Sequence, residues 1–513
     1  MADSTSAETS AQPETHLLNN FARDLRAYWP LWLIVAAAVF LRLYEIHRLP
    51  GMHGDEAWYG VQARRLLAGE LVEWRTPTSN VPGILQLGSL TLLHAIFPPS
   101  LLLLRLPVLI SSLASMLLIY AIGRRFFGQG AAMTAVVLMA CLPINIAYAR
   151  LGWDPSHSTL LILASAYAAF AGRRLLCALF FALAMTNHPS AVFVAPFLTL
   201  AYLGFDFSSE GWRSSVIDTV KLVALLSLAV LLGIAISPAT THYVSLSAAL
   251  SRLADPQGWA QFGVMFCRLL SGDTNYAYSV GVGLGSARAW ADWAIGAGLT
   301  MTLVAGLVIV VRKSNWKVAG MLAGMIASLA LLYLAAGKWA LNPGLERFGY
   351  PMVSITALTV AAVVVPQKYW FQPLLALISL PMLASFWLHY VTPLKDGRTR
   401  QALGFWTGWQ DPARSVFQLI SADAQRSGAR IIVEDWWLQM PISYYAVGAP
   451  FEVIDAGQSG GIETAESSGG TYWVTYGGSA LDRSLGKRIR VQPRWTVHTT
   501  NRNDEIRIWK YSN

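Results

Sequence analysis

The sequence predicts an α-helical, polytopic membrane protein that carries a small α/β domain at its C-terminal end. Of the 513 residues, 54% are hydrophobic and only 13% are charged, and the mean hydropathy is +0.44. A soluble chain of this length needs more charge to cover its surface, whereas a bilayer accepts apolar side chains all round a helix. Charge and strand-like runs return only after residue 395, which marks the second domain.

Eleven apolar stretches indicate about 11 transmembrane helices. They cover residues 29–46, 101–122, 130–148, 156–172, 175–188, 190–204, 216–236, 293–311, 318–336, 348–365 and 370–390. The fifth and sixth are short and are separated only by Asn187-His188-Pro189, so they could form a tight hairpin that does not cross completely. An odd number of spans would place the two ends of the chain on opposite sides of the membrane.

Basic residues in the short loops predict the orientation. If the N-terminus is cytoplasmic, every inner connection carries Lys or Arg, as inner loops generally do. The segments that then face outward are 47–100, 149–155, 237–292, 337–347 and everything after 391. We therefore expect a multi-pass protein of a bacterial-type cytoplasmic (inner) membrane, with a periplasmic or extracytoplasmic C-terminal domain.

Three regions follow from these patterns. Residues 1–28 are expected to be a disordered cytoplasmic tail, since they are rich in Ser, Thr, Ala and Glu and lack the apolar run of a signal peptide. Residues 29–394 form the transmembrane domain, with outer loops at 47–100 and 237–292. Residues 395–513 form the α/β domain, in which 411–427 and 442–447 are expected to be helical, 430–434 and 472–475 to be strands, and 495–511 to be a hairpin.

Composition also argues against several kinds of function. Three cysteines, two of them inside spans, imply no disulfide framework. The formal net charge of +9 comes mostly from loop Lys and Arg that set topology, so nucleic-acid binding is not expected. The sequence has no Walker-type glycine-rich loop and no Cys/His metal signature.

Two adjacent carboxylates follow the first span, in Gly51-Met-His-Gly-Asp55-Glu56-Ala-Trp-Tyr59. Adjacent acids at a lipid–water boundary are costly unless they are used. Asp55 and Glu56 are therefore candidates for chemistry at the membrane surface. The structural alternative is that Asp55 opens a helix by accepting a backbone N–H, with Glu56 favoured by the helix dipole.

A third acid lies in the loop between the third and fourth spans, which reads Arg150-Leu-Gly-Trp-Asp154-Pro155. On the predicted topology Asp154 and Asp55 share one side of the membrane, so two separate loops could converge on one aqueous pocket. Alternatively, Asp154 caps the fourth span, because Pro155 suits a first helical position.

Two arginines are candidates for holding an anion. Arg347, in Glu346-Arg-Phe-Gly-Tyr350, offers a planar fork of donors that suits phosphate, and the Tyr350 hydroxyl could add a donor. Glu346 and Arg347 could instead form a structural ion pair. Arg105 is a charge within an apolar run, which either serves function or extends to the outer interface.

Two histidines lie at the predicted outer edge. His53 and His188 could bind sugar or phosphate, although a lone histidine in such a place is more often a packing residue. The Gly- and Tyr-rich loop from Gly258 to Trp290, with Tyr278, could close over a substrate, as long loops often do. Its sequence supplies no assignable chemistry.

In their order along the chain, these features resemble the GT-C superfamily of polyprenyl-phosphate-sugar-dependent glycosyltransferases, and within it the protein mannosyltransferases (glycosyltransferase family 39) and lipid A aminoarabinose transferases. The likeness covers residues 29 to about 390. The features that carry it are Asp55-Glu56, Arg105-Leu-Pro107, Asp154, Glu346-Arg-Phe-Gly-Tyr350 and the long outer loop.

The resemblance implies a GT-C fold and the transfer of one sugar from a lipid-linked donor, such as undecaprenyl or decaprenyl phosphate, to a lipid, glycan or protein acceptor on the outer face. It implies that Asp55 is the general base and that Glu56 and Asp154 position the acceptor or tune the base. Donor phosphate would be held by Arg347 and Tyr350, with Arg105 a further candidate and Glu346, His188 and His53 nearby.

Physical chemistry supports this assignment independently. Phosphate leaves readily when cations meet its negative charge, so one base and a cationic cradle suffice for a single inverting displacement, without a required cofactor. A glycosidase instead needs one carboxyl group to protonate a poor leaving group. The chain also shows no nucleotide-sugar site, which fits a donor delivered within the bilayer.

Two points depart from the resemblance. Aminoarabinose transferases carry a Lys in a Lys-Pro-Pro-like stretch before the second span, whereas this chain reads Ser79-Asn80-Val-Pro-Gly83. Related oligosaccharyltransferases hold a divalent metal with acids, and Asp55, Glu56 and Asp154 could do so here.

Two other classes of protein remain open at this point. A transporter or lipid flippase would show repeat symmetry and ionisable groups near the bilayer midplane, whereas these acids cluster outside. A non-catalytic component of envelope assembly with a sensing outer domain is the other alternative.

Overall fold

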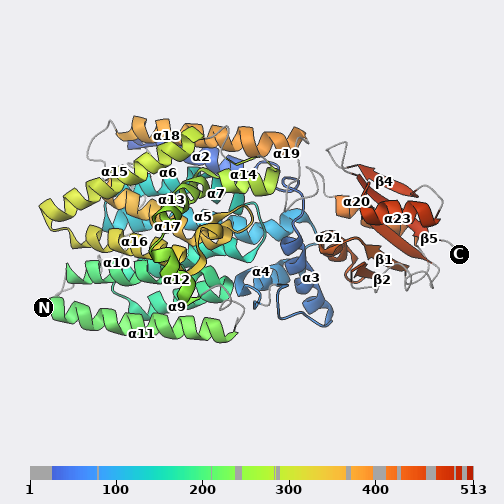
Figure 1. Ribbon diagram of the computed structural model, residues 1–513, viewed down its shortest axis with the longest axis horizontal. Helices are drawn as coiled ribbons and strands as arrows, with labels where there is room; N and C mark the ends of the chain where they lie inside the picture. The colour runs from blue at the N-terminus through green and yellow to red at the C-terminus, as the bar shows by residue number, and fades with distance from the viewer. Residues whose placement is uncertain are drawn as a thin grey trace, which may run out of the picture.

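The chain folds into a helical bundle with a small sheet domain at one end (Figure 1). The computed structural model describes residues 26–77, 80–208, 211–236, 245–281, 283–284, 289–364, 371–396, 412–424, 429–457, 470–489, 493–498 and 505–511. Most of the predicted tail, 1–28, lies outside the described residues. Mostly helical structure with a small C-terminal sheet confirms the predicted fold class.

Every predicted span coincides with a helix or with consecutive helices. These are α2 (Trp29–Leu43), α5 (Leu101–Phe126), α6 (Gln129–Cys141) with α7 (Pro143–Tyr148), α8 (Ser158–Phe170), α9 (Arg174–Asn187), α10 (Ala195–Phe207), α11 (Trp212–Ile236), α15 (Ala289–Lys313), α16 (Trp316–Ala336), α17 (Tyr350–Val363) and α18 (Phe371–Phe386). Within the described residues, six helical segments are long and apolar enough to cross a bilayer, and α2, α6, α9 and α17 are shorter apolar helices. The count of 11 crossings therefore stays a prediction.

Close backbone contact holds part of the bundle together. A Cβ atom on Gly204 of α10 would lie 2.3 Å from the Trp316 carbonyl oxygen, and one on Gly320 of α16 would lie 2.4 Å from the Leu200 carbonyl oxygen. Only glycine permits this approach, and small residues are the usual means by which membrane helices pack closely.

Short helices in or next to the predicted outer segments position the site. They are α3 (Gly54–Ala68), α4 (Ile84–His94), η1 (Asp154–His157), η2 (Pro189–Val194), α12 (Leu246–Leu253), α13 (Pro256–Ser271), α14 (Asp273–Val280), η4 (Lys338–Leu341), η5 (Glu346–Phe348), η6 (Trp387–Val391) and α19 (Thr392–Asp396). In Figure 1, α3 and α4 lie between the bundle and the sheet domain.

The C-terminal domain is the small α/β unit that the sequence predicts. Its sheet has the order β2-β1-β3-β5-β4, with parallel pairing of β1 (Ala429–Val433) to β2 (Phe451–Asp455) and β3 (Thr471–Tyr476). The expected hairpin is the antiparallel pair β4 (Trp495–His498) and β5 (Glu505–Tyr511). Helices α20 (Pro412–Asp423), α21 (Trp436–Ala446) and α23 (Ala480–Ile489) accompany the sheet.

A buried arginine joins the outer ends of the first helices. Arg105 of α5 is 0% exposed, and all five of its N–H groups donate hydrogen bonds. Two reach the Glu56 carboxylate at 3.0 Å each, and the others reach the carbonyl oxygens of Ile46, Leu49 and Gly51 at 2.9 to 3.0 Å. One side chain therefore fixes the connection after α2 against the first turn of α3.

Glu56 completes this junction. It is 0% exposed, and its Oε1 accepts the Gly152 N–H at 2.6 Å while its Oε2 accepts the His53 N–H at 3.2 Å. The Gly152 contact brings the loop before η1 to α3. A buried ion pair is tolerated when its remaining lone pairs are satisfied in this way.

We expect the Glu56→Gln substitution to destabilise the protein strongly. It leaves the buried Arg105 without a counter-charge, and removing one partner of a buried pair typically costs about 3–5 kcal/mol. Thermal unfolding in detergent micelles measures the effect. Glu452→Gln, which breaks an exposed pair with Arg430, is the control and should change stability by less than about 1 kcal/mol. Equal shifts in the two variants would contradict the role of Glu56.

Candidate active site

A cavity of about 350 Å³ lies where the predicted outer segments meet. Its polar lining includes Asp55, Asp154, His188 and Arg347. Apolar and aromatic residues supply most of the remainder, namely Trp58, Trp153, Pro155, Val192, Phe193, Ala335, Ala336, Trp339, Leu345 and Phe348. Pockets that combine a few convergent polar groups with an apolar lining are typical binding sites.

Asp55 enters the cavity from the first turn of α3. Its side chain does not cap the helix, because His53 is the N-cap residue and His53 and Glu56 form the capping box. His53 Nδ1 lies 3.7 Å from Asp55 Oδ2, and the Asp55 side chain is 31% exposed. Asp55 thus keeps its oxygens available, and the capping alternative for this residue is wrong.

Asp154 faces Asp55 from η1. Burial and the negative charge of Asp55 raise the pKa of the Asp154 carboxyl to about 7, although Arg347 and a hydrogen bond from the Tyr59 hydroxyl oppose the shift. Trp153 and not Asp154 occupies the N-cap position of η1. Two predicted outer loops therefore bring two acids into one cavity.

Arg347 supplies the cation of this cavity. In the described part of the chain, no carboxylate lies within ion-pairing distance of its guanidinium, so the predicted alternative of a Glu346–Arg347 ion pair is not formed. Arg347 nevertheless acts electrostatically on Asp154, His188 and His53. An uncompensated guanidinium beside two acids is suited to a bidentate oxyanion such as phosphate.

Two predicted roles disagree with the structure. Glu56 and Arg105 do not line the cavity, because each is fully buried and uses its polar atoms in the junction described above. Arg105 has no donor left for a phosphate, and Glu56 has no place beside an acceptor. Their predicted roles in catalysis and phosphate binding are therefore corrected to a structural role.

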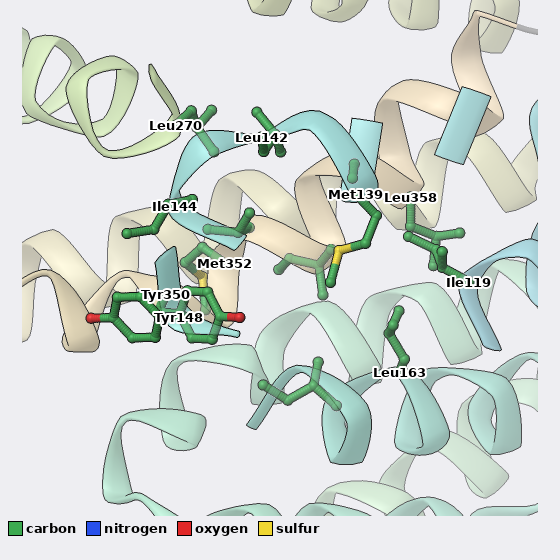
Figure 2. Close-up of a cluster of buried hydrophobic side chains, with 14 of the residues drawn as sticks. Ile119, Met139, Leu142, Ile144, Tyr148, Leu163, Leu270, Tyr350, Met352 and Leu358 are labelled. Carbon is green, nitrogen blue, oxygen red and sulfur yellow. The ribbon is translucent and has the colours of Figure 1, made fainter. Parts of the chain in front are cut away.

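Tyr350 and Glu346 also lie outside the cavity lining. Tyr350 is 3% exposed and stacks on Tyr148 with ring centroids 4.0 Å apart, within a cluster of buried hydrophobic side chains (Figure 2). Glu346 is 1% exposed and accepts a hydrogen bond from Asn275 Nδ2 at 3.3 Å. Burial raises the pKa of the Glu346 carboxyl to about 7. Neither residue is placed beside Asp55, Asp154 and Arg347 in the cavity lining.

The two histidines differ in their contacts. His188 lines the cavity, and its Nδ1 lies 2.6 Å from Ser190 Oγ. His53 is 1% exposed, accepts the Asp55 N–H at Nδ1 and contacts the Tyr278 hydroxyl through Nε2 at 2.8 Å. His53 therefore packs behind Asp55 and does not face a ligand.

The sequence analysis missed several residues of the site. Tyr59 donates to Asp154 and accepts the Gly83 N–H at 2.8 Å. It lies one helical turn after Asp55, so the i, i+4 spacing was a signal that could have identified it. Thr76 and Asn80 line the cavity from the segment where aminoarabinose transferases carry their Lys. In this chain the same segment therefore contributes polar, uncharged side chains to the cavity.

Metal binding was the alternative use of the acids. Among the described residues, no group of three or more His, Cys, Asp or Glu side chains is arranged to hold a metal ion. Glu56 is committed to Arg105 and Gly152, which leaves Asp55 and Asp154 as the two carboxylates that a cation could contact from within the cavity.

Asp154 should titrate near neutral pH. In a Glu346→Gln background, which removes the other carboxyl group whose pKa is raised to about 7, infrared spectroscopy should show a protonated-carboxyl band that disappears as the pH rises through about 7. Asp55→Asn removes a neighbouring negative charge and should move this transition to lower pH, whereas Arg347→Gln should move it to higher pH. A transition near the ordinary carboxyl range, unchanged in both variants, would contradict this electrostatic coupling.

Comparisons with known proteins found similarities in sequence and in fold. Residues 89–236 match the family model of dolichyl-phosphate-mannose-protein mannosyltransferase. The structure is similar to that of ArnT from Cupriavidus metallidurans bound to undecaprenyl phosphate, with a TM-score of 0.51 and 12% identity over 93% of this chain and 97% of that chain. For ArnT in the apo state the values are 0.41 and 12%, over 94% and 98%. No curated protein sequence matches the chain.

The matched segment begins within α4 and ends with α11, so it includes Arg105, Asp154 and His188. The structural likeness extends over nearly the whole chain and shows that its fold is that of ArnT. The chain is therefore similar to a mannosyltransferase family over residues 89–236 and to ArnT in its fold.

Proposed function

We propose that the protein transfers a single sugar from a polyprenyl-phosphate donor to a hydroxyl of a lipid, glycan or protein acceptor on the outer face of the cytoplasmic membrane. The observation that carries this proposal is the meeting of Asp55, Asp154 and Arg347 in one partly apolar cavity. The match to a mannosyltransferase family and the undecaprenyl phosphate bound by ArnT support a donor of this class.

Asp55 acts as the general base in this proposal. It takes the proton from the acceptor hydroxyl as that oxygen forms a bond to the anomeric carbon, and the bond from this carbon to the phosphate oxygen breaks. The electron pair of that bond leaves with the polyprenyl phosphate. Since the acceptor attacks opposite the leaving group in one step, the anomeric configuration inverts.

Asp154 keeps Asp55 in its working form. When two carboxyl groups are close, the one with the higher pKa holds the proton and the other stays ionised. The pKa of Asp154 is raised to about 7, so around neutrality Asp154 can hold or share a proton beside Asp55. The Tyr59 hydroxyl orients Asp154 from the next turn of α3.

Arg347 receives the developing charge on the leaving phosphate. Its guanidinium has no carboxylate partner among the described residues, so it is free to form two parallel hydrogen bonds to phosphate oxygens. A phosphate whose charge is met in this way needs no proton to leave. The apolar lining from Val192, Phe193, Ala335 and Ala336 suits the first part of a polyprenyl chain.

The transporter and assembly-component alternatives gain no support from the structure. The candidate acids gather at the ends of helices and not at the middle of the bundle. Mass analysis of envelope glycans and glycolipids in a deletion strain would identify the sugar by the missing mass and the acceptor by the molecule that loses it. An unchanged envelope profile would contradict the proposed transfer.

Asp55→Asn should abolish most turnover and preserve donor binding. Loss of a general base typically lowers the rate by about 10²–10⁴-fold. Turnover is measured in membranes of the complemented deletion strain, and binding is measured with purified protein and undecaprenyl phosphate. A variant that keeps its rate would refute the base, and one that loses binding as well would show that Asp55 serves the donor instead.

Arg347→Ala should weaken binding of undecaprenyl phosphate by about 10–100-fold, because a hydrogen bond to a charged group contributes about 1.5–3 kcal/mol. Arg347→Lys should recover only part of this loss, since an ammonium group cannot form two parallel bonds. Arg430→Ala, which changes an exposed arginine of β1 that does not line the cavity, is the control for charge alone. Equal affinity in wild type and Arg347→Ala would remove Arg347 from the site.

A further inference from the structure

The C-terminal domain contacts the helix that carries Asp55. Helix α21 packs along α3, as the neighbouring ribbons in Figure 1 also show. A Cβ atom on Gly54 would lie 2.4 Å from Trp436 Cζ3 and 2.8 Å from Trp437 Cε3. The tryptophans therefore press directly on the first turn of α3, next to Asp55.

The contact continues along α3. A Cβ atom on Gly60 would lie 2.6 Å from the Tyr444 ring, and the Arg64 guanidinium donates to the carbonyl oxygens of Tyr444 and Val447 at the C-terminal end of α21. Three successive turns of α3 thus meet one helix of the outer domain. Such a contact fixes the direction of α3 as well as its position.

Tyr444 extends the contact to α5. Its hydroxyl oxygen accepts the Ser100 N–H at 2.9 Å and lies 2.9 Å from His94 Nε2. Ser100 is the N-cap of α5, the helix that provides Arg105. The outer domain therefore contacts both helices that the Glu56–Arg105 ion pair joins.

Trp437 also covers the residue behind Asp55. Its ring meets the His53 ring edge-on with centroids 5.1 Å apart, and the Trp153 ring does so from another direction at 5.4 Å. His53 accepts the Asp55 N–H and contacts Tyr278 of α14. His53 is thus enclosed by three separate parts of the chain, one of which is the C-terminal domain.

We propose that the C-terminal domain forms part of the transferase site, with Trp437 as a positioning residue that acts on Asp55 through His53 and the first turn of α3. The proposal rests on the proposed function, in which Asp55 is the base. In this proposal α21 does more than pack against the sheet of its own domain, because it also fixes the position of Asp55. Trp437 does not line the cavity, so it acts through neighbours and not on the substrate.

The environment of His53 gives the proposal a specific signature. Burial lowers the pKa of His53 below its usual range, so the ring is neutral and leaves Asp55 free to accept a proton. The ionisable groups that face His53 are Asp55, Glu56, Arg105, Tyr278 and Arg347. If water reached the ring, His53 would become protonated at higher pH and would then bind the Asp55 carboxylate.

Trp437→Ala should lower kcat about tenfold and leave the affinity for undecaprenyl phosphate within about twofold of wild type, because Arg347 is untouched. The acid limb of the pH profile of kcat should move upward, toward the ordinary histidine pKa of about 6.5. Trp437→Phe keeps an aromatic edge against His53 and should restore most of the rate and the original profile.

Trp473→Ala is the matched control, since Trp473 packs with Trp509 and Leu485 in a separate core cluster of the same domain. It should lower stability without moving the pH profile. An unchanged profile and rate in folded Trp437→Ala, or the same change in Trp473→Ala, would overturn the positioning role. Asp55→Asn in parallel separates the two proposals, because activity in that variant would defeat the proposed base itself.

Discussion

The buried ion pair between Glu56 and Arg105 is the constraint on which the site depends. A charged pair this deep is stable only when each hydrogen-bonding atom has a partner, and here the remaining partners are backbone groups of two connecting segments. Satisfying Arg105 therefore requires the connection after α2, the start of α3 and the loop before η1 to meet at one point. This geometry also fixes the position of Asp55, because Asp55 is the neighbour of Glu56 in the first turn of α3.

The unequal surroundings of the acids then divide their tasks. Glu56 is neutralised by Arg105, Asp154 is buried beside a like charge, and Asp55 remains partly exposed at the cavity. Glu56 thus has a structural role, Asp154 has a raised pKa, and Asp55 has a carboxylate available in the cavity. The opposing cation, Arg347, comes from a distant part of the chain and completes the arrangement without an ion-pair partner among the described residues.

The sequence predicted much of the fold and part of the site. Apolar length located stretches that are helical in the structure, and alternation with turn residues located the sheet domain. The approach of Asp55 to Asp154 could be predicted because both lie in predicted outer loops.

The pairing of Glu56 with Arg105 could not be predicted from the sequence. A sequence pattern does not show that two charges pair with each other in the interior. The location of the Tyr350 ring could not be predicted for a similar reason. Its position at the start of α17 does not show that the ring stacks on Tyr148. The packing of α21 on α3 joins residues nearly 400 positions apart, and no local sequence pattern predicts such a contact.

The central claim is that one carboxylate, Asp55, activates the acceptor for a single displacement at the anomeric carbon. The most direct test is the anomeric configuration of the transferred sugar, determined by NMR for the donor and for the product. A single displacement predicts that the configuration inverts. Retention of configuration would require a covalent intermediate or a second displacement and would contradict the account.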